Sequence, residues 1–248
     1  MPKTYDISHK VKYYECDMTK QVSVPMLLNL AILVSNMQSE DLQVGDDFVH
    51  ERGMGWIVLQ YDIDIKRRPM VDEVVTLRTM AREFNAFFAN RDFVFIDADG
   101  EEIIKIHSLF SLMDMEKRKL VRIPKEMVQG YEPEVVKRIS RGEAPASITD
   151  DDVIAYEKQY GVRYTDIDFN LHVNNSHYFD WMIDVLDVDF LNQHEITTMN
   201  IRFEKEVSAS DTVTSQAVMN DDQTQSKHRI LFSDGGLATE AVINWTNK

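Results

Sequence analysis

The segment that decides the fold reads VKYYECD at residues 11–17, and it recurs as VRYTDID at residues 162–168. The two copies align without a gap at an offset of 151 residues (162 minus 11). The valine, the first tyrosine and the last aspartate are identical, and the Lys/Arg and Glu/Asp exchanges keep the charge. A repeat of this length in a chain of 248 residues predicts two copies of one structural module.

The patterns that follow each copy come in the same order. In the first copy, Ser23 and Pro25 are typical of a helix start, and the apolar run Met26–Val34 predicts a helix buried on most sides. Strand patterns then predict an antiparallel run at residues 59–65, 74–77, 93–96 and 103–112. After the second copy we expect a helix at about residues 175–186 and strands at 199–203, 213–218, 228–232 and 238–245.

A helix covered by the apolar face of an antiparallel sheet is a stable layer arrangement, and two tandem copies suggest a fused pseudo-dimer. This α+β pattern resembles a double hotdog fold, with two tandem hotdog modules, each a long helix wrapped by an antiparallel β-sheet. We expect modules at residues 1–132 and 157–248. Residues 133–156, with Gly142, Pro145 and the acidic run 150–152, are expected to form the linker.

Composition excludes several classes of protein. The net charge of −15 argues against a nucleic-acid-binding protein, since phosphate binding needs a dense Lys/Arg surface. The single cysteine, Cys16, leaves no internal disulfide or CxxC site, which favours a reducing, cytoplasmic location. The N-terminus shows no secretion signal, and the run at residues 26–34 is too short to span a membrane.

An acidic partner would have to meet a local basic cluster on this acidic chain. Each cluster taken alone is also explained as a set of solvated loop charges. The three candidates are Lys66-Arg67-Arg68, Lys117-Arg118-Lys119 with Arg122, and Lys137-Arg138 with Arg141.

The two copies differ in reactive side chains just before the predicted helix. Asp168, Asn170 and His172 are spaced so that alternate side chains of an extended segment converge. The first copy has Thr19 and Gln21 at the last two of these positions, so it has no titratable base there. Such residues before a helix also serve simply as caps and turn formers. The backbone N–H groups of Val173, Asn174 and Asn175 are expected at the helix N-terminus, where they could stabilise an oxyanion.

The segment TDIDFNLHVNNSHY at residues 165–178, followed by Trp181, resembles the signature of the acyl-ACP thioesterases of bacteria and plant plastids. These enzymes carry D-x-N-x-H-V-N-N, then a tyrosine and a tryptophan. The resemblance implies that Asp168, Asn170, His172 and Glu206 are the catalytic residues. Plant members often have a cysteine directly after the glutamate, but here the residue is Val207, which favours a carboxylate and imidazole site over a thiol.

Two points about Glu206 remain for the structure. Opposite Glu206, the first copy is expected to have Lys66 or Arg67, neither of which replaces a carboxylate. Strict alternation with Ile201 and Phe203 would place Glu206 on the polar face of its strand. A bulge near Lys205 would turn it toward the site.

The resemblance implies hydrolysis of fatty acyl-ACP to free fatty acid and holo-ACP, in the second module, with the first module non-catalytic and holding an acyl pocket. The expected partners are acyl carrier protein and a fatty acyl chain, with no nucleic acid and no membrane span. A homodimer is left open. No cofactor or metal is expected, since the substrate itself carries the phosphopantetheine. The alternatives are a hotdog hydroxyacyl dehydratase and a non-catalytic acyl-binding sensor.

Overall fold

The computed structural model describes residues 2–168 and 172–248. It divides into two compact units, which we call the N-terminal and C-terminal modules. The N-terminal module consists of Met1–Ser23 with Leu27–Gly142, and the C-terminal module consists of Val24–Met26 with Glu143–Lys248.

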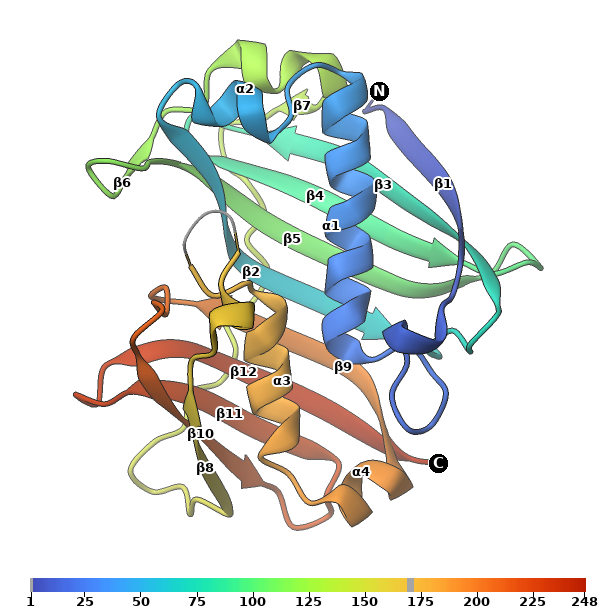
Figure 1. Ribbon diagram of the computed structural model, residues 1–248, viewed down its shortest axis with the longest axis vertical. Helices are drawn as coiled ribbons and strands as arrows, with labels where there is room; N and C mark the ends of the chain where they lie inside the picture. Colours follow the sequence, from blue (N-terminus) through green and yellow to red (C-terminus); the bar gives the residue numbers. More distant parts are fainter. Residues whose placement is uncertain (1, 169–171) are drawn as a thin grey trace. The chain divides into compact units, whose positions relative to one another are not determined.

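The N-terminal module has one long helix lying on one face of an antiparallel sheet (Figure 1). The strand order in this sheet is β1-β3-β4-β5-β2, with β6 paired to β5 and β7 paired to β3. Its helices are α1 (Val24–Asp41) and α2 (Asp46–His50), with single 3-10 turns η1 (Tyr13–Glu15), η2 (Lys125–Met127) and η3 (Gln129–Tyr131). Its strands are β1 (Thr4–Lys10), β2 (Met54–Ile65), β3 (Val74–Phe84), β4 (Phe88–Ile96), β5 (Glu102–Asp114), β6 (Lys119–Val121) and β7 (Glu134–Val135).

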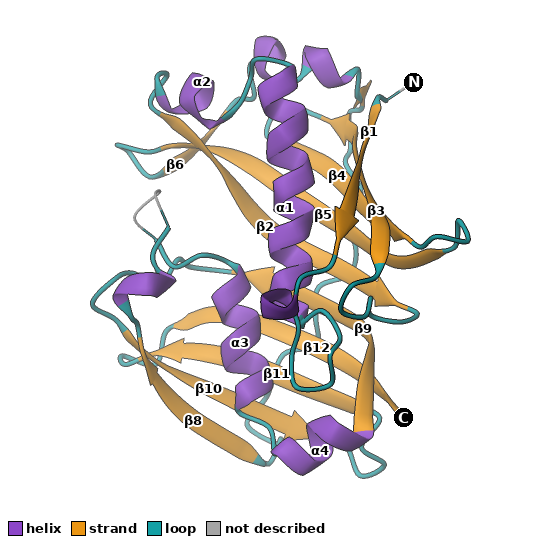
Figure 2. Cartoon of the chain, turned by 45° about the vertical axis from the view of Figure 1, so that its right-hand side comes forward, coloured by secondary structure: helices purple, strands orange, loops and turns teal. Residues whose placement is uncertain are grey.

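The C-terminal module repeats this arrangement, with α3 lying on one face of its sheet (Figure 2). The strand order is β8-β10-β11-β12-β9. Its helices are α3 (Ser176–Asp184) and α4 (Val188–Gln193), with the 3-10 turn η4 (Tyr164–Asp166). Its strands are β8 (Tyr156–Gly161), β9 (His194–Phe203), β10 (Thr212–Met219), β11 (Gln225–Phe232) and β12 (Leu237–Asn247).

The predicted repeat is confirmed element by element. The turns η1 and η4 lie 151 residues apart (164 minus 13), as do the isolated bridges Cys16–Val22 and Ile167–Val173 (167 minus 16). Strands β1, β3, β4, β5 and β2 correspond in order to β8, β10, β11, β12 and β9. All eight predicted strands and both predicted helices are present, with longer bounds for most of them.

Both modules bury the apolar side chains that the sequence patterns selected. In the N-terminal sheet, the fully buried residues include Leu77, Phe93 and Ile104. On α3, the predicted positions Tyr178, Trp181, Met182 and Val185 are all buried, which confirms the helical spacing. None of the helices within residues 2–168 and 172–248 is long and apolar enough to cross a membrane.

A series of hydrogen-bonded side chains lies inside the C-terminal core. The indole N–H of Trp245 donates to Ser226 Oγ at 2.8 Å, and Ser226 Oγ lies 2.7 Å from Nε2 of His228. His228 is fully buried, and burial lowers the pKa of its imidazole from the usual 6.5 to about 3. The imidazole therefore remains neutral in the folded protein under most conditions.

This histidine makes stability depend on pH. In the unfolded chain, His228 binds a proton below a pKa of about 6.5, but in the folded protein it does so only below about 3. Its contribution to stability is therefore complete above pH 6.5 and is lost as the pH falls from 6.5 toward 3. At pH 4.5 the loss is on the order of 3 kcal/mol.

We expect His228→Leu to flatten the fall in unfolding free energy between pH 7 and pH 4.5, as measured by urea denaturation at both values. The His50→Gln variant is the control: His50 is exposed, and the change leaves the buried imidazole of His228 in place, so the variant should keep the wild-type dependence. Equal pH dependence in wild type and His228→Leu would contradict the assignment.

Candidate active site

The site is built on a loop between η4 and α3. The bridge between Ile167 and Val173 closes the loop, and the Asp168 N–H donates to the carbonyl of His172 at 2.9 Å. Asp168 and His172 are both half-buried at the base of this loop. Asn170, the third predicted member, lies outside the described residues.

His172 and Glu206 come together as an imidazole–carboxylate pair. Nε2 of His172 lies 3.2 Å from Oε2 of Glu206, with the two side chains 22% and 34% exposed. The Oε2 atom itself is buried. Two of the four predicted residues, far apart in the sequence, therefore form an imidazole–carboxylate pair that solvent reaches only in part.

A bulge brings Glu206 to this position. Strand β9 ends at Phe203, and the N–H groups of Glu204 and Lys205 both donate to the carbonyl of Ala238, at 2.9 and 3.1 Å. Two residues then oppose one, which is the pattern of a β-bulge. The predicted bulge near Lys205 is confirmed, and Glu206 leaves the alternation of β9.

The expectation of three free N–H groups at the helix N-terminus is wrong for two of them. The Val173 N–H donates to the carbonyl of Val207 at 3.1 Å, and the Asn174 N–H donates to the carbonyl of Asp166 at 2.9 Å. These groups pair with neighbouring loop backbone, because the chain is still in the closed loop before α3. Asn175 is the N-cap of α3, and its N–H has no acceptor among the described residues. It is the one predicted oxyanion donor still available in the described part of the chain.

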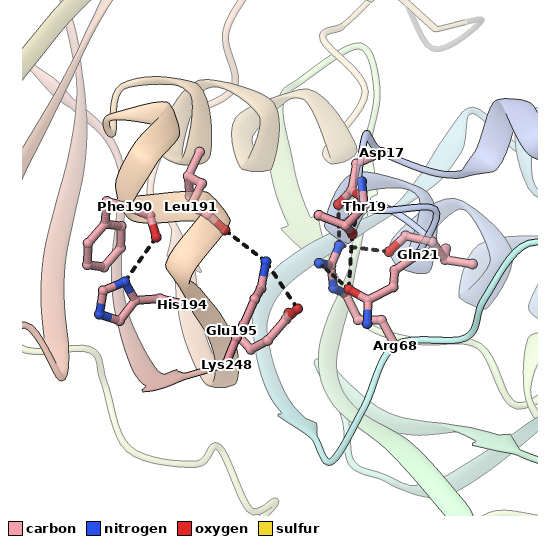
Figure 3. Close-up of polar contacts among 10 residues, drawn as sticks. Asp17, Thr19, Gln21, Arg68, Phe190, Leu191, His194, Glu195 and Lys248 are labelled. Atoms are coloured by element: carbon pink, nitrogen blue, oxygen red, sulfur yellow. Dashed lines mark hydrogen bonds and ion pairs between the residues drawn. The ribbon is translucent and has the colours of Figure 1, made fainter.

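The first copy contains a matching constellation with a different chemistry (Figure 3). The Asp17 N–H donates to the carbonyl of Gln21 at 2.9 Å, as Asp168 does to His172. The Val22 N–H donates to the carbonyl of Pro69 at 2.8 Å, as Val173 does to Val207. Pro69 thus corresponds to Val207, so Arg68 stands where Glu206 stands in the second copy. This corrects the prediction of Lys66 or Arg67.

Three alternate side chains of the first loop converge on one another and on Arg68. Arg68 Nη1 pairs with Asp17, and Nη2 donates to Oε1 of Gln21 at 2.8 Å. The Thr19 hydroxyl also donates to Asp17 and lies 3.1 Å from Oε1 of Gln21. The same alternate spacing therefore brings side chains together in the first copy, whereas the prediction for Asp168, Asn170 and His172 stays a prediction because Asn170 lies outside the described residues.

In this first-copy cluster, the charge of Asp17 is balanced by Arg68. Burial acts to raise the pKa of Asp17, but the hydrogen bonds from Thr19 and Arg68 and the charge of Arg68 outweigh it and lower that pKa. Arg68 is only 9% exposed. The cluster has no imidazole and no second carboxylate, so it lacks the pair that His172 and Glu206 form.

Cys16 and His177 are not part of the His172–Glu206 pair. Cys16 is half-buried, and burial, together with the charges of Asp17 and Glu15, raises the pKa of its thiol. A thiolate is therefore disfavoured there. His177 pairs with Asp180 at 2.8 Å and lies 3.9 Å from Asp166. Within residues 2–168 and 172–248, no cluster of three or more His, Cys, Asp or Glu residues is placed to hold a metal ion.

Comparisons with known proteins match both modules. Residues 2–131 match the acyl-ACP thioesterase N-terminal domain, and residues 149–247 match the acyl-ACP thioesterase C-terminal domain. A Lactobacillus plantarum protein assigned as an oleoyl thioesterase is 39% identical, with a TM-score of 0.93 over 99% of this chain and 97% of that one. The 12:0-ACP thioesterase of Umbellularia californica has the same fold, with a TM-score of 0.87 at 19% identity over 99% of this chain and 98% of that one.

The curated relatives are longer proteins. A palmitoyl-acyl carrier protein thioesterase of Cuphea hookeriana is 23% identical over 215 residues, which are 81% of this chain and 50% of the relative. The chain thus spans about half the length of that relative. The predicted α+β fold of two tandem hotdog modules is confirmed by the structural matches. With both domains matched, the chain belongs to the acyl-ACP thioesterase family.

Proposed function

We propose that the protein hydrolyses the thioester bond of fatty acyl-ACP and releases free fatty acid and holo-ACP. The observation that carries the proposal is the His172–Glu206 pair, 3.2 Å apart, in the copy that matches the family signature. The other copy has Gln21 and Arg68 at these two positions, so it has no imidazole–carboxylate pair.

The reaction adds water across the acyl carbon–sulfur bond. The water oxygen bonds to the acyl carbon, the carbon–sulfur bond breaks, and the sulfur leaves as a thiolate that then takes a proton. A thiol with a pKa of about 8.5 leaves readily, so the enzyme must chiefly activate water and orient the carbonyl. We assign water activation to Glu206 and Asp168, or direct attack by one of them, in which case the thiolate leaves first and water then cleaves the acyl–carboxylate anhydride. We assign orientation of the thioester to His172 and Asn170, aided by the Asn175 N–H. The acyl chain would lie along the apolar helix and sheet interface of the N-terminal module.

The test is release of free thiol from a panel of saturated and monounsaturated acyl-ACPs. We expect release by the wild type and none by the double variant Asp168→Asn with His172→Ala. Loss of the substrate to an enoyl product without free thiol would instead identify a dehydratase. Binding without any turnover would identify an acyl sensor.

The proposed reaction needs no cofactor of the enzyme's own, because the phosphopantetheine comes with the substrate. A cytoplasmic location stays a prediction, and a homodimer stays open.

Internal ion pairs argue against the first basic cluster as the docking surface for the acidic carrier protein. Arg68 is buried and paired with Asp17, and Arg67 binds Glu73 and Asp97, each at 2.8 Å. Two of the three cations in the first cluster are therefore already paired with carboxylates of the same module. Burial of charges in such pairs leaves little attraction for a partner.

We propose that the carrier protein docks on the hairpin of β5 and β6. Lys117, Arg118, Lys119 and Arg122 are all exposed there, and Leu120 among them is 42% exposed. The Lys137–Arg138 cluster is also exposed, but its third cation, Arg141, lies over the ring of Phe88 at 4.2 Å from the centroid. Lys117 pairs with Asp114 at 2.9 Å, but its side chain stays 70% exposed, so the hairpin presents four exposed cations around an apolar side chain.

The double variant Lys119→Glu with Arg122→Glu is expected to raise KM for acyl-ACP by about 10-fold at low salt and to leave kcat unchanged. Hydrolysis of a small acyl-pantetheine thioester should be unaffected, since it has no carrier protein. Lys137→Glu with Arg138→Glu is the matched control. A larger KM effect in the control pair would move the docking surface there.

A further inference from the structure

Tyr178 is buried on α3 and its ring packs inside the C-terminal module. The ring meets Phe203 edge to face, with centroids 5.3 Å apart, and lies 5.4 Å from the ring of Trp181. Only 2% of the residue is exposed. These contacts explain an aromatic ring at this position, but a phenylalanine would make them equally well.

The hydroxyl makes a separate contact with the segment that carries Glu206. The N–H of Val207 donates to the Tyr178 hydroxyl oxygen at 2.9 Å. The carbonyl of the same residue accepts the N–H of Val173 at 3.1 Å. Both backbone groups of Val207 are therefore fixed, one to α3 and one to the residue that follows His172. Glu206 directly precedes Val207, so these two bonds set where the two paired side chains leave the backbone.

The first copy lacks both partners of this bond. Tyr178 corresponds to Leu27 at the constant offset of 151 residues (178 minus 27), and Val207 corresponds to Pro69. Leucine has no hydroxyl to accept, and proline has no N–H to donate. The other bond is retained, since the Val22 N–H donates to the carbonyl of Pro69 at 2.8 Å. Donor and acceptor are thus present together in the copy with Glu206 and absent together in the copy with Arg68.

We propose that Tyr178 is a positioning residue, which holds Glu206 against His172 by accepting the Val207 N–H. The inference rests on the proposed function. Tyr178 does not touch the reacting atoms in this account; it acts through the backbone of Val207.

The ionisation of Tyr178 fits this role. Burial, joined by the charges of Asp211 and Asp168, raises the pKa of Tyr178 to about 12, although the Val207 hydrogen bond lowers it somewhat. The hydroxyl therefore keeps its proton at neutral pH. A neutral oxygen that accepts one N–H suits a fixed structural bond and not a general base.

The test is a double-mutant cycle. Tyr178→Phe keeps the ring and removes the acceptor, and Val207→Pro removes the donor by installing the residue that the first copy tolerates at this position. We expect each variant to lower kcat for acyl-ACP by about 10- to 100-fold with KM within about threefold, since small displacements of reacting groups cost this much. The double variant should be no slower than the slower single one, because both changes remove the same bond.

Tyr160→Phe is the matched control. Its hydroxyl also bonds to α3, donating to Asp184 at 2.9 Å, but it does not reach the Glu206 segment. It should keep wild-type kcat. The profile of kcat against pH adds a second readout, because a displaced His172–Glu206 pair should shift its midpoint, whereas a smaller folded fraction would only scale it.

Full activity of Tyr178→Phe would overturn the proposal, and so would losses that multiply in the double variant. If Tyr178→Phe is poorly folded, Val207→Pro alone decides, since wild-type kcat in that variant also overturns it. A wild type that releases no thiol from any acyl-ACP is a different result and refutes the proposed function.

Discussion

Glu206→Gln is expected to lower kcat for acyl-ACP hydrolysis by about 1000-fold while KM stays within about threefold. Glutamine keeps the size of the side chain but loses the charge that pairs with His172 at 3.2 Å. An amide neither takes a proton from water nor attacks the thioester carbon. The measurement is thiol release under saturating acyl-ACP.

Glu204→Gln is the matched control for this variant. Glu204 lies two residues earlier, is exposed and forms an ion pair with Arg202, so its loss should leave kcat unchanged. His172→Ala should be about as slow as Glu206→Gln, and the double variant should be no slower than the slower single variant, since the two act as a unit. A Glu206→Gln enzyme with more than about a third of wild-type kcat would exclude Glu206 from the chemistry.

Most of the fold could be predicted because it is written twice. Buried helices and central strands carry enough apolar residues to reveal their period, and each copy supports the reading of the other. The edge strands β1 (Thr4–Lys10) and β8 (Tyr156–Gly161) were not predicted. An edge strand has only one neighbour, so its sequence keeps many polar residues and a weak period. The short helices α2 and α4 are equally weak patterns.

The site could be predicted less completely, and for two different reasons. The first reason is that the helices of the two copies differ in length: α1 has 18 residues and α3 has 9. The offset is therefore not constant beyond the helix, and only the hydrogen bond from Val22 to Pro69 identifies Arg68 as the counterpart of Glu206. The sequence is also silent on which backbone N–H groups are already paired, as those of Val173 and Asn174 are. The role of the Tyr178 hydroxyl depends on the same kind of information.

Arg68→Ala is expected to lower the unfolding free energy by about 3 kcal/mol and to reduce Tm by roughly 6–12 °C. Arg68 is 9% exposed, and its guanidinium binds the Asp17 carboxylate, the Gln21 amide oxygen and the carbonyl of Val22. Removing it leaves a partly buried carboxylate without its cation and two oxygens without their donor. Thermal and urea denaturation measure the loss, and kcat below the new Tm should stay near the wild-type value because this copy holds no catalytic pair.

Arg67→Ala separates this effect from the loss of any arginine. Arg67 is 42% exposed in its pairs with Glu73 and Asp97, so its removal should cost no more than about 1 kcal/mol.

A pH series adds a test in which the direction of the change is predicted. Because the pKa of Asp17 is lowered in the folded protein, its contribution to the unfolding free energy is complete above its unfolded pKa. That contribution is lost as the pH falls through its folded pKa. The stability gap between wild type and Arg68→Ala should therefore narrow in acid. Equal costs for Arg67→Ala and Arg68→Ala would mean that the first-copy cluster is an ordinary surface network. A larger cost for Arg68 would show that the first-copy cluster stabilises the fold.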